Sequence, residues 1–215
     1  MEDNGIKLIE EIMRKLRRAA LERDASVSDV VHEALANSIF FQETDVNFFD
    51  VMNNIEKNMN ETEHFITNVD LYNYTVIVKS PLRYVHRPEL KYEIKITQND
   101  HAVVGRMSAS LRSQDINTAK CFSAFLNFWI DLETAYFPAR PGGKQIEYIT
   151  DIGYFSRKMY MPAGHKDSRV VGAAISDYIR IYDELFKYYY YHPNGGRGEI
   201  ERMYRDYMKT GKLKI

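Results

Sequence analysis

Histidine, cysteine and carboxylate side chains are the groups most able to do chemistry in this chain, and their spacing limits which chemistry is open. The single cysteine, Cys121, has no histidine beside it, and no two histidines stand at the His-x-x-x-His spacing of a helical zinc site. We therefore expect no metal centre and no cofactor. The six histidines are His32, His64, His86, His101, His165 and His192.

One short stretch, "RYVHRPE", gathers several reactive side chains. It could bind an anion or carry out acid–base chemistry, although a solvated loop explains the same residues. Its charged and imidazole groups are Arg83, His86, Arg87 and Glu89. The glycine pairs in "ARPGGK" and "PNGGRGE" match neither the Walker spacing nor the dinucleotide fingerprint, and Cys121 lies in an apolar run. The sequence favours a protein that is not an enzyme.

The composition is that of an ordinary globular protein. Of the 215 residues, 27% are charged and 45% hydrophobic, and the formal net charge of −1 gives no general attraction to nucleic acid or to an acidic membrane surface. One cysteine excludes a disulfide framework and fits a reducing cytoplasm. No apolar stretch approaches the roughly 18 residues of a membrane span. We expect a cytoplasmic protein without a membrane partner.

Helices are predicted before the first strand. Residues 5–24 carry apolar positions at helical spacing, with Lys and Arg on the other side. Those positions are Ile6, Ile9, Ile12, Met13, Leu16, Ala19 and Ala20. A second helix in "SVSDVVHEALANSIFF" carries Val31, Ala34, Leu35 and Ile39, and a third covers about 46–60. Residues 1–45 are thus predicted to form a helical hairpin or N-terminal extension.

Alternation with a period of two follows after residue 70. In "YNYTVIVK" the side chains of Tyr72, Tyr74, Val76 and Val78 fall on one side, and "LKYEIKIT" and "VVGRMSASLR" alternate in the same way. Two more strands are predicted in "IEYITDIGYFSRKMYM". Alternation leaves one face buried and one face wet, which indicates an antiparallel sheet of about five strands.

Two long helices complete the predicted order α-β-β-β-α-β-β-α. One spans 116–137, and the other begins at a cap on Asp167 or Ser168 and ends near Tyr191. In the second, Val171, Ile175 and Tyr182 lie on an apolar half. The polar half holds Arg169, Ser176, Arg180, Asp183, Glu184 and Lys187. We predict an α+β fold with the helices packed on one face of the sheet in residues 46–192, followed by a basic C-terminal helix or tail in residues 193–215.

The helix at 116–137 is apolar around most of its circumference. Its polar side chains form one narrow stripe, namely Lys120, Ser123, Asn127, Asp131 and Thr134. The apolar arc spans roughly 240°, against ~100° for a surface helix. Leaving large apolar side chains uncovered forfeits about 1.5–3 kcal/mol each. The sheet can cover one side, and we expect the N-terminal helices, a second subunit or a client protein to cover the other.

Four consecutive tyrosines, 188–191, surround the end of the last long helix, so a single buried face cannot take them all. Tyrosine suits a protein interface because it joins a large apolar ring to a polar tip. The C-terminal helix folding back against the ring cluster explains these residues equally well. The predicted partner-binding residues are Phe125, Phe128, Trp129, Leu132, Tyr188, Tyr190 and Tyr191.

Four segments carry a resemblance to a known family: "VVGRMSASL" followed by "RSQD", "INTAKCFSAFLNFWIDLETAYF", "GYFSRKMYMPAG" and "SRVVGAAISDYIRIYDELF". Over residues 46–190 the chain resembles the YbjN-type domain of bacterial sensory transduction regulators, which shares its fold with type III secretion chaperones. The resemblance implies a non-catalytic protein-binding or chaperone-like module. It also implies a dimer made through the central helix, here 116–137.

Nucleic-acid binding is the alternative function. The stretch "LRRAALERDASVSDVVHEALANSIF" is similar to the two helices of ribbon-helix-helix repressors. Residues 1–40, however, carry six Lys and Arg against eight Asp and Glu, which is the wrong balance for contacting phosphates. The basic tail, with Tyr204 and Tyr207 among its cations, could touch RNA or an acidic partner, or could pack as a solvated helix. We expect a protein partner or a second copy of the chain.

Overall fold

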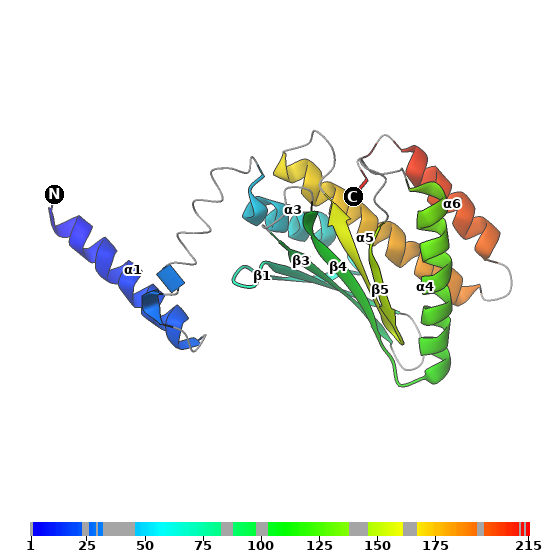
Figure 1. Ribbon diagram of the computed structural model, residues 1–215, viewed down its shortest axis with the longest axis horizontal. Coiled ribbons are helices and arrows are strands. Elements are labelled where there is room, and N and C mark those ends of the chain that lie inside the picture. Colours follow the sequence, from blue (N-terminus) through cyan, green and yellow to red (C-terminus); the bar gives the residue numbers. More distant parts are fainter. Residues whose placement is uncertain are drawn as a thin grey trace. The chain divides into compact units, whose positions relative to one another are not determined.

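The computed structural model (Figure 1) describes residues 2–22, 26–28, 30–31, 46–82, 88–97, 103–137, 146–160, 167–192, 196–210, 212 and 214–215, with only the backbone described for residues 2–11 and 103. The chain divides into two compact units, Met1–Asp45 and Val46–Ile215.

The first unit contains α1 (Glu2–Glu22), which confirms the first predicted helix. Near its end Ala20 is buried, as is Val30 in the short helical stretch that follows. Most of the second predicted helix, including Ala34, Leu35 and Ile39, lies outside the described residues.

The second unit begins with α3 (Phe48–Asn60), close to the predicted span of 46–60. The Asn47 side chain accepts hydrogen bonds from the main-chain N–H groups of Phe49 and Asp50, which satisfies two of the free donors at the start of the helix. One face of α3 is fully buried: Val51, Met52, Ile55 and Met59.

The sheet is antiparallel with the order β1-β2-β3-β4-β6-β5. Its strands are β1 (Ile66–Asp70), β2 (Thr75–Pro81), β3 (Glu89–Ile96), β4 (Val103–Arg112), β5 (Tyr148–Asp151) and β6 (Tyr154–Tyr160). The predicted alternation is confirmed in β3, where Leu90, Tyr92 and Ile94 are buried between half-buried or exposed charged side chains.

The strand that the sequence analysis missed is β1, so the sheet has six strands and not about five. This strand, "ITNVD", forms an edge of the sheet, and its burial pattern shows no fully buried position. An edge strand that lies half in water needs no run of apolar side chains. The period-two signal was therefore too weak to predict it.

Three helices complete the second unit: α4 (Ile116–Tyr136), α5 (Ser168–Tyr191) and α6 (Arg197–Lys209). Asp167 caps α5, whereas the hydroxyl of Ser168 accepts a hydrogen bond from the main-chain N–H of Asn47 and so ties α5 to the start of α3. In Figure 1, α5 runs along the sheet beside α3, and α4 stands next to α5 and α6. The α+β prediction with helices packed on the sheet is confirmed.

The apolar arc of α4 is covered within its own chain, by α5 and α6. Phe125 and Trp129 are fully buried, and their rings contact Tyr182 of α5. The ring of Tyr204, from α6, lies 5.2 Å from Trp129. The covering elements are thus α5 and the C-terminal helix α6, neither of which was among the N-terminal helices, second subunit or client expected from the sequence.

The crossing of α3 and α5 depends on a glycine. A Cβ atom at Gly172 would lie 2.8 Å from Cβ of Asn54 and 3.0 Å from the main-chain oxygen of Val51. Both distances are too short for an unperturbed contact, so only glycine lets the two helices approach this closely.

We expect Gly172→Ala to destabilise the protein by about 1–3 kcal/mol, because the added methyl group would force the helices apart. Helix propensity alone predicts the opposite sign, a gain of ~0.5–1 kcal/mol. Urea unfolding followed by circular dichroism measures the difference.

Gly198→Ala, in α6, is the matched control, because no atom lies within 4 Å of the added Cβ. We expect it to be neutral or to gain up to ~1 kcal/mol. Equal gains at both positions would contradict the close helix crossing.

Candidate functional site

A groove of about 780 Å³ opens between the turn after α3 and the C-terminal half of α5. Residues 62–65 and Pro81 line one side, and α5 lines the other. The α5 residues recur at intervals of three or four and therefore share one face of the helix. They are Arg180, Asp183, Glu184, Lys187 and Tyr191.

A buried carboxylate forms the base of the groove. Asp183 is only 2% exposed, and its Oδ1 accepts a hydrogen bond of 2.9 Å from the hydroxyl of Tyr92 on β3. Its Oδ2 lies 2.7 Å from Nζ of Lys187, one turn further along α5. Lys187 also donates a 2.7 Å hydrogen bond to the buried hydroxyl of Ser80 on β2. This network joins α5 to two strands.

The network keeps its charges compensated. Burial, together with the neighbouring Asp183 charge, raises the pKa of Tyr92 well above its ordinary value, so its hydroxyl stays protonated and donates to the carboxylate. A buried carboxylate without partners would be far too costly, and here one cation and one phenol offset that cost.

His64 brings an imidazole to the mouth of the groove. Its side chain is 47% exposed, and its Nε2 lies 3.5 Å from Oδ2 of Asp183. The ring packs against Phe65 with a centroid distance of 4.1 Å. An imidazole oriented by a buried carboxylate can accept or donate a proton, or can hydrogen-bond to a ligand.

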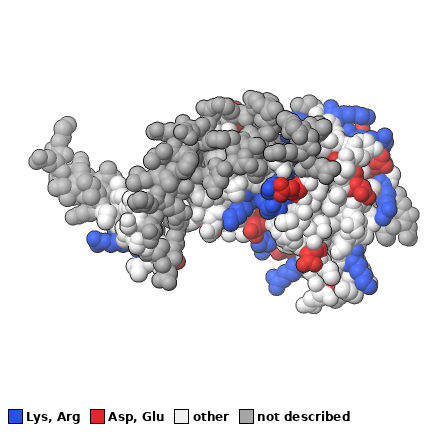
Figure 2. Space-filling view, viewed as in Figure 1, with Lys and Arg blue, Asp and Glu red and all other residues white. Residues whose placement is uncertain are grey.

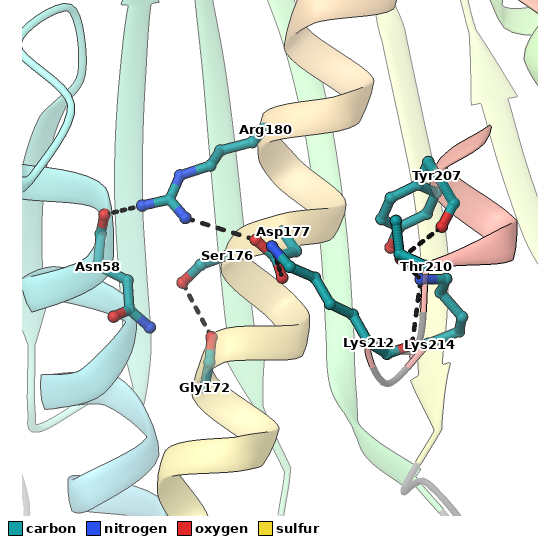
Figure 3. Close-up of polar contacts among 9 residues, drawn as sticks. All are labelled: Asn58, Gly172, Ser176, Asp177, Arg180, Tyr207, Thr210, Lys212 and Lys214. Carbon is teal, nitrogen blue, oxygen red and sulfur yellow. Dashed lines mark hydrogen bonds and ion pairs between the residues drawn. The ribbon is translucent and has the colours of Figure 1, made fainter. Parts of the chain in front are cut away.

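Arg180 and its neighbours fix α5 to the elements on either side of it. Figure 3 shows Arg180 reaching from α5 to the main-chain oxygen of Asn58 at the end of α3, and also to Asp177. The other carboxylate oxygen of Asp177 pairs with Lys212 at 3.0 Å. Lys214 lies over the ring of Tyr207 at 4.0 Å. These contacts place the C-terminal residues against α5.

A second ionic cluster lies at the junction of α4, α5 and β6. Arg157 and Glu133 are buried and paired at 3.2 Å, and the Arg157 guanidinium lies 4.4 Å from the ring centroid of Tyr178. Arg157 also donates a 2.5 Å hydrogen bond to the main-chain oxygen of Ile215. Because these side chains are enclosed by the chain itself, the cluster holds elements together and offers no surface to a ligand.

The predicted partner-binding residues on α4 are largely covered. Phe125, Trp129 and Leu132 are buried, and Phe128 is half-buried against Tyr189 and under the guanidinium of Arg197. Phe125, Trp129 and Leu132 are therefore not accessible to a partner in this structure.

The tyrosine run divides between packing and exposure. Tyr190 hydrogen-bonds to the hydroxyl of Thr118 on α4 at 3.1 Å, and Tyr188 stacks on His192 at 4.1 Å. Tyr191 is 44% exposed and lines the groove. Of the predicted set, it is the residue that the structure brings to the candidate site.

The other candidate residues of the sequence analysis play smaller parts. Arg83, His86 and Arg87 lie outside the described residues, whereas Glu89 is half-buried in β3 and pairs with Lys79 at 3.4 Å. Cys121 is half-buried, and burial raises the pKa of its thiol, which fits a packing role.

One assignment on α5 is corrected. Ser176 and Asp183 were placed on the wet half of the helix, but both are buried. The hydroxyl of Ser176 donates a hydrogen bond to the main-chain oxygen of Gly172. Asp183 accepts a hydrogen bond from Tyr92 and forms an ion pair with Lys187. A helical wheel sorts residues by polarity and cannot detect a polar side chain whose partner comes from a distant strand.

Surface charge does not gather into one large patch of a single sign on the face seen in Figure 2, where Lys and Arg lie among Asp and Glu. In α6, Arg202 pairs with both Glu199 and Asp206. The cations of the C-terminal segment are therefore partly neutralised by its own acids.

Among the residues described, no group of three or more His, Cys, Asp or Glu side chains could hold a metal ion. No helix in the described part of the chain has both the length and the apolar character to cross a membrane.

None of the protein-family models, curated proteins or solved structures compared with the chain matches it.

We expect Asp183→Asn to destabilise the protein by about 3–5 kcal/mol, because Lys187 would keep its charge with no carboxylate beside it. Chemical denaturation at neutral pH measures the loss. Glu184→Gln changes the adjacent residue, which is exposed at the rim, and should alter stability by less than ~0.5 kcal/mol. Similar losses for both variants would contradict the network around Asp183.

The enclosed pair predicts a pH dependence of stability. Burial raises the pKa of Glu133 and outweighs the opposing effect of Arg157. The folded state then binds this proton more tightly than the unfolded state does. The stabilisation from Glu133 is complete below its unfolded pKa of ~4.3 and is lost as the pH rises through the higher folded pKa.

Comparison with Glu133→Gln isolates that contribution. We expect the free energy of unfolding of the native protein, relative to the variant, to fall as the pH rises from about 4 through the raised folded pKa of Glu133, by ~1.4 kcal/mol for each unit of pKa difference. Urea titrations at several pH values measure it. A relative stability that rises with pH would show that pairing with Arg157 outweighs burial.

Proposed function

We propose that the chain is a non-catalytic protein-binding module that takes a segment of a partner protein into the groove between the α3–β1 turn and α5. The observation that carries the proposal is the open groove itself, which has Tyr191 exposed at one end and the His64–Asp183–Lys187 cluster along its wall. Residues of α5 supply half of the lining of the groove, so this side of the site is built on a rigid element.

The chemistry of the groove suits a polypeptide better than a small apolar ligand. Small-molecule pockets are mostly apolar with a few polar groups. By residue type most of the lining is charged or polar, and both signs are present: Glu63 and Glu184 against Arg180 and Lys187. The stems of these side chains make the accessible lining somewhat more apolar than polar, so the groove offers apolar contact together with charge. Tyr191 adds an aromatic ring with a polar tip, a type of side chain enriched at protein interfaces. A partner segment with charges of both signs fits such a surface.

The resemblance to YbjN-type and type III secretion chaperone-like domains supports a binding role. It also favours a contact through the central helix, but the large apolar side chains of α4 are already covered by α5 and α6. Use of α4 as an interface would require those helices to separate. The groove needs no such rearrangement, and we therefore place the binding site there.

A second candidate function rests on His64. A half-exposed imidazole held 3.5 Å from a buried carboxylate is an arrangement used for acid–base catalysis. An enzyme of this kind would lose turnover in His64→Gln while the variant stayed folded. Such a result, without any partner binding at the groove, would replace the protein-binding proposal.

Site-specific photo-crosslinking tests the proposal. A benzophenone amino acid placed at Tyr191 in the full chain should capture a defined protein in native cells. The same probe at Tyr72, which is 68% exposed but does not line the groove, is the matched control. We expect an adduct from position 191 that is absent from position 72, with a single cross-linked peptide identified by mass spectrometry.

Binding of that peptide, made synthetically, then gives a quantitative check. Glu184→Arg reverses an exposed rim charge and should change the dissociation constant by about tenfold or more, whereas the same reversal at Glu56 of α3, which does not line the groove, should leave it unchanged within about twofold. Identical adducts from positions 191 and 72, or no change of affinity with Glu184→Arg, would remove the groove as the binding site.

A further inference from the structure

The helix of the first unit, α1, carries an apolar stripe, and two large side chains of that stripe are exposed among the residues whose side chains the structure describes. Ile12 is 48% exposed and Met13 is 37% exposed, although both belong to the stripe, whereas Ala20 near the end of the helix is buried. Exposed large apolar side chains on one face of a helix mark a surface for another element.

The stripe has the spacing of a coiled-coil seam. Positions 6, 9, 13, 16 and 20 of α1 are separated alternately by three and four residues, and each is apolar. Ile12 and Ala19 widen the stripe on one side. At 21 residues α1 is three heptads long. The pattern fits pairing with another helix along most of the length of α1.

The charge of α1 changes sign along its axis. Residues 2–11 hold four acidic residues and one lysine, and residues 12–22 hold four basic residues and one glutamate. The halves thus carry formal charges of −3 and +3. A parallel pair of such helices would place like charges beside one another, whereas an antiparallel pair would place each acidic half against a basic half.

We infer that α1 pairs antiparallel with α1 of a second copy of this chain, with Ile12 and Met13 at the centre of the contact. A second copy of the chain is the partner that best fits this pattern. Its α1 supplies both an apolar seam and, in the antiparallel orientation, a half of opposite charge beside each half of the first α1. The inference is independent of the groove, since α1 belongs to the other unit. It also places self-association on α1 and not on α4.

The helix dipole favours the same charge order within a single helix, since acids near the N-terminus and bases near the C-terminus are each stabilising. The dipole, however, does not account for an exposed apolar seam. The experiment must therefore change the seam and the charges separately.

Sedimentation of the full chain measures the assembly. We expect a mass of twice 25.2 kDa for the native chain at micromolar concentration and a monomer for the variant carrying Ile12→Glu and Met13→Glu. Leu21→Glu is the matched control: Leu21 is 83% exposed and lies roughly 100° around α1 from the centre of the seam, so this variant should remain a dimer. Far-UV circular dichroism establishes that all three proteins stay folded.

Charge reversal tests the pairing rule. A chain with Arg17→Glu and Arg18→Glu and a chain with Glu10→Lys and Glu11→Lys should each be largely monomeric alone and should form a mixed dimer when combined. Homodimers that persist in both variants would overturn the charge argument.

Spin labels fix the orientation, in a Cys121→Ser background. An antiparallel pair centred between Ile12 and Met13 brings labels at Arg14 of the two copies close together and separates labels at Asp3 by about 28 Å along the axis, given a rise of 1.5 Å per residue. Short distances at both positions would show a parallel pair and overturn the inference. A native chain that is monomeric throughout, or a dimer that survives Ile12→Glu with Met13→Glu, would overturn it equally.

Discussion

The packing of three helices around Trp129 is the interaction on which the second unit depends. The indole N–H donates a 3.0 Å hydrogen bond to the hydroxyl of Tyr178, and the rings of Tyr182 and Tyr204 lie 4.8 and 5.2 Å from it. These rings come from α5 and α6, so one side chain of α4 holds both. These contacts fix the position of α5. Asp183 and Lys187, which are also on α5, then lie within hydrogen-bonding distance of Tyr92 on β3 and Ser80 on β2.

The elements of the fold were predictable where burial follows a period. In β3, α3 and α5 one face packs against a neighbouring layer and the other faces solvent. The apolar residues therefore recur with the period of the strand or helix, and this local pattern is enough to predict the element. The prediction missed β1, because an edge strand half in water has little pattern. The cover of α4 was also not predicted, since a sequence shows that an apolar arc needs a partner but not which element supplies it.

The candidate site was much less predictable than the fold. Its network joins Ser80, Tyr92 and Asp183, which lie on three different elements. Only two signals were present in the sequence. Tyr92 falls in an inward-facing row, so its hydroxyl required a buried partner. Asp183 and Lys187 stand four residues apart on one helix and can therefore pair. The sequence alone does not show that Tyr92 and Asp183 are partners, because that pairing depends on the tertiary contact between α5 and β3.

Glu133 and Asp183 are both buried carboxylates, but their partners differ in access to solvent. This difference distinguishes a pair that only holds the fold together from a network that can contact a ligand. Glu133 and Arg157 are enclosed by α4, β6 and the last residues of the chain. A buried ion pair is rarely a net source of stability compared with apolar packing, and this one serves to fix three segments in register. Asp183 is about as deeply buried as Glu133, yet its partners Lys187 and His64 open onto a groove.

The charge network around Asp183 can therefore act on something outside the chain, which the enclosed pair cannot do. Lys187 has three N–H donors, of which Asp183 and Ser80 account for two. A ligand that accepts the third would add a hydrogen bond to a cation whose position is already set, and it would lose little side-chain entropy in doing so. Preorganisation of this kind is what a binding site requires. It is the physical reason for proposing the site at the groove and not on α4, whose large apolar side chains are covered by α5 and α6.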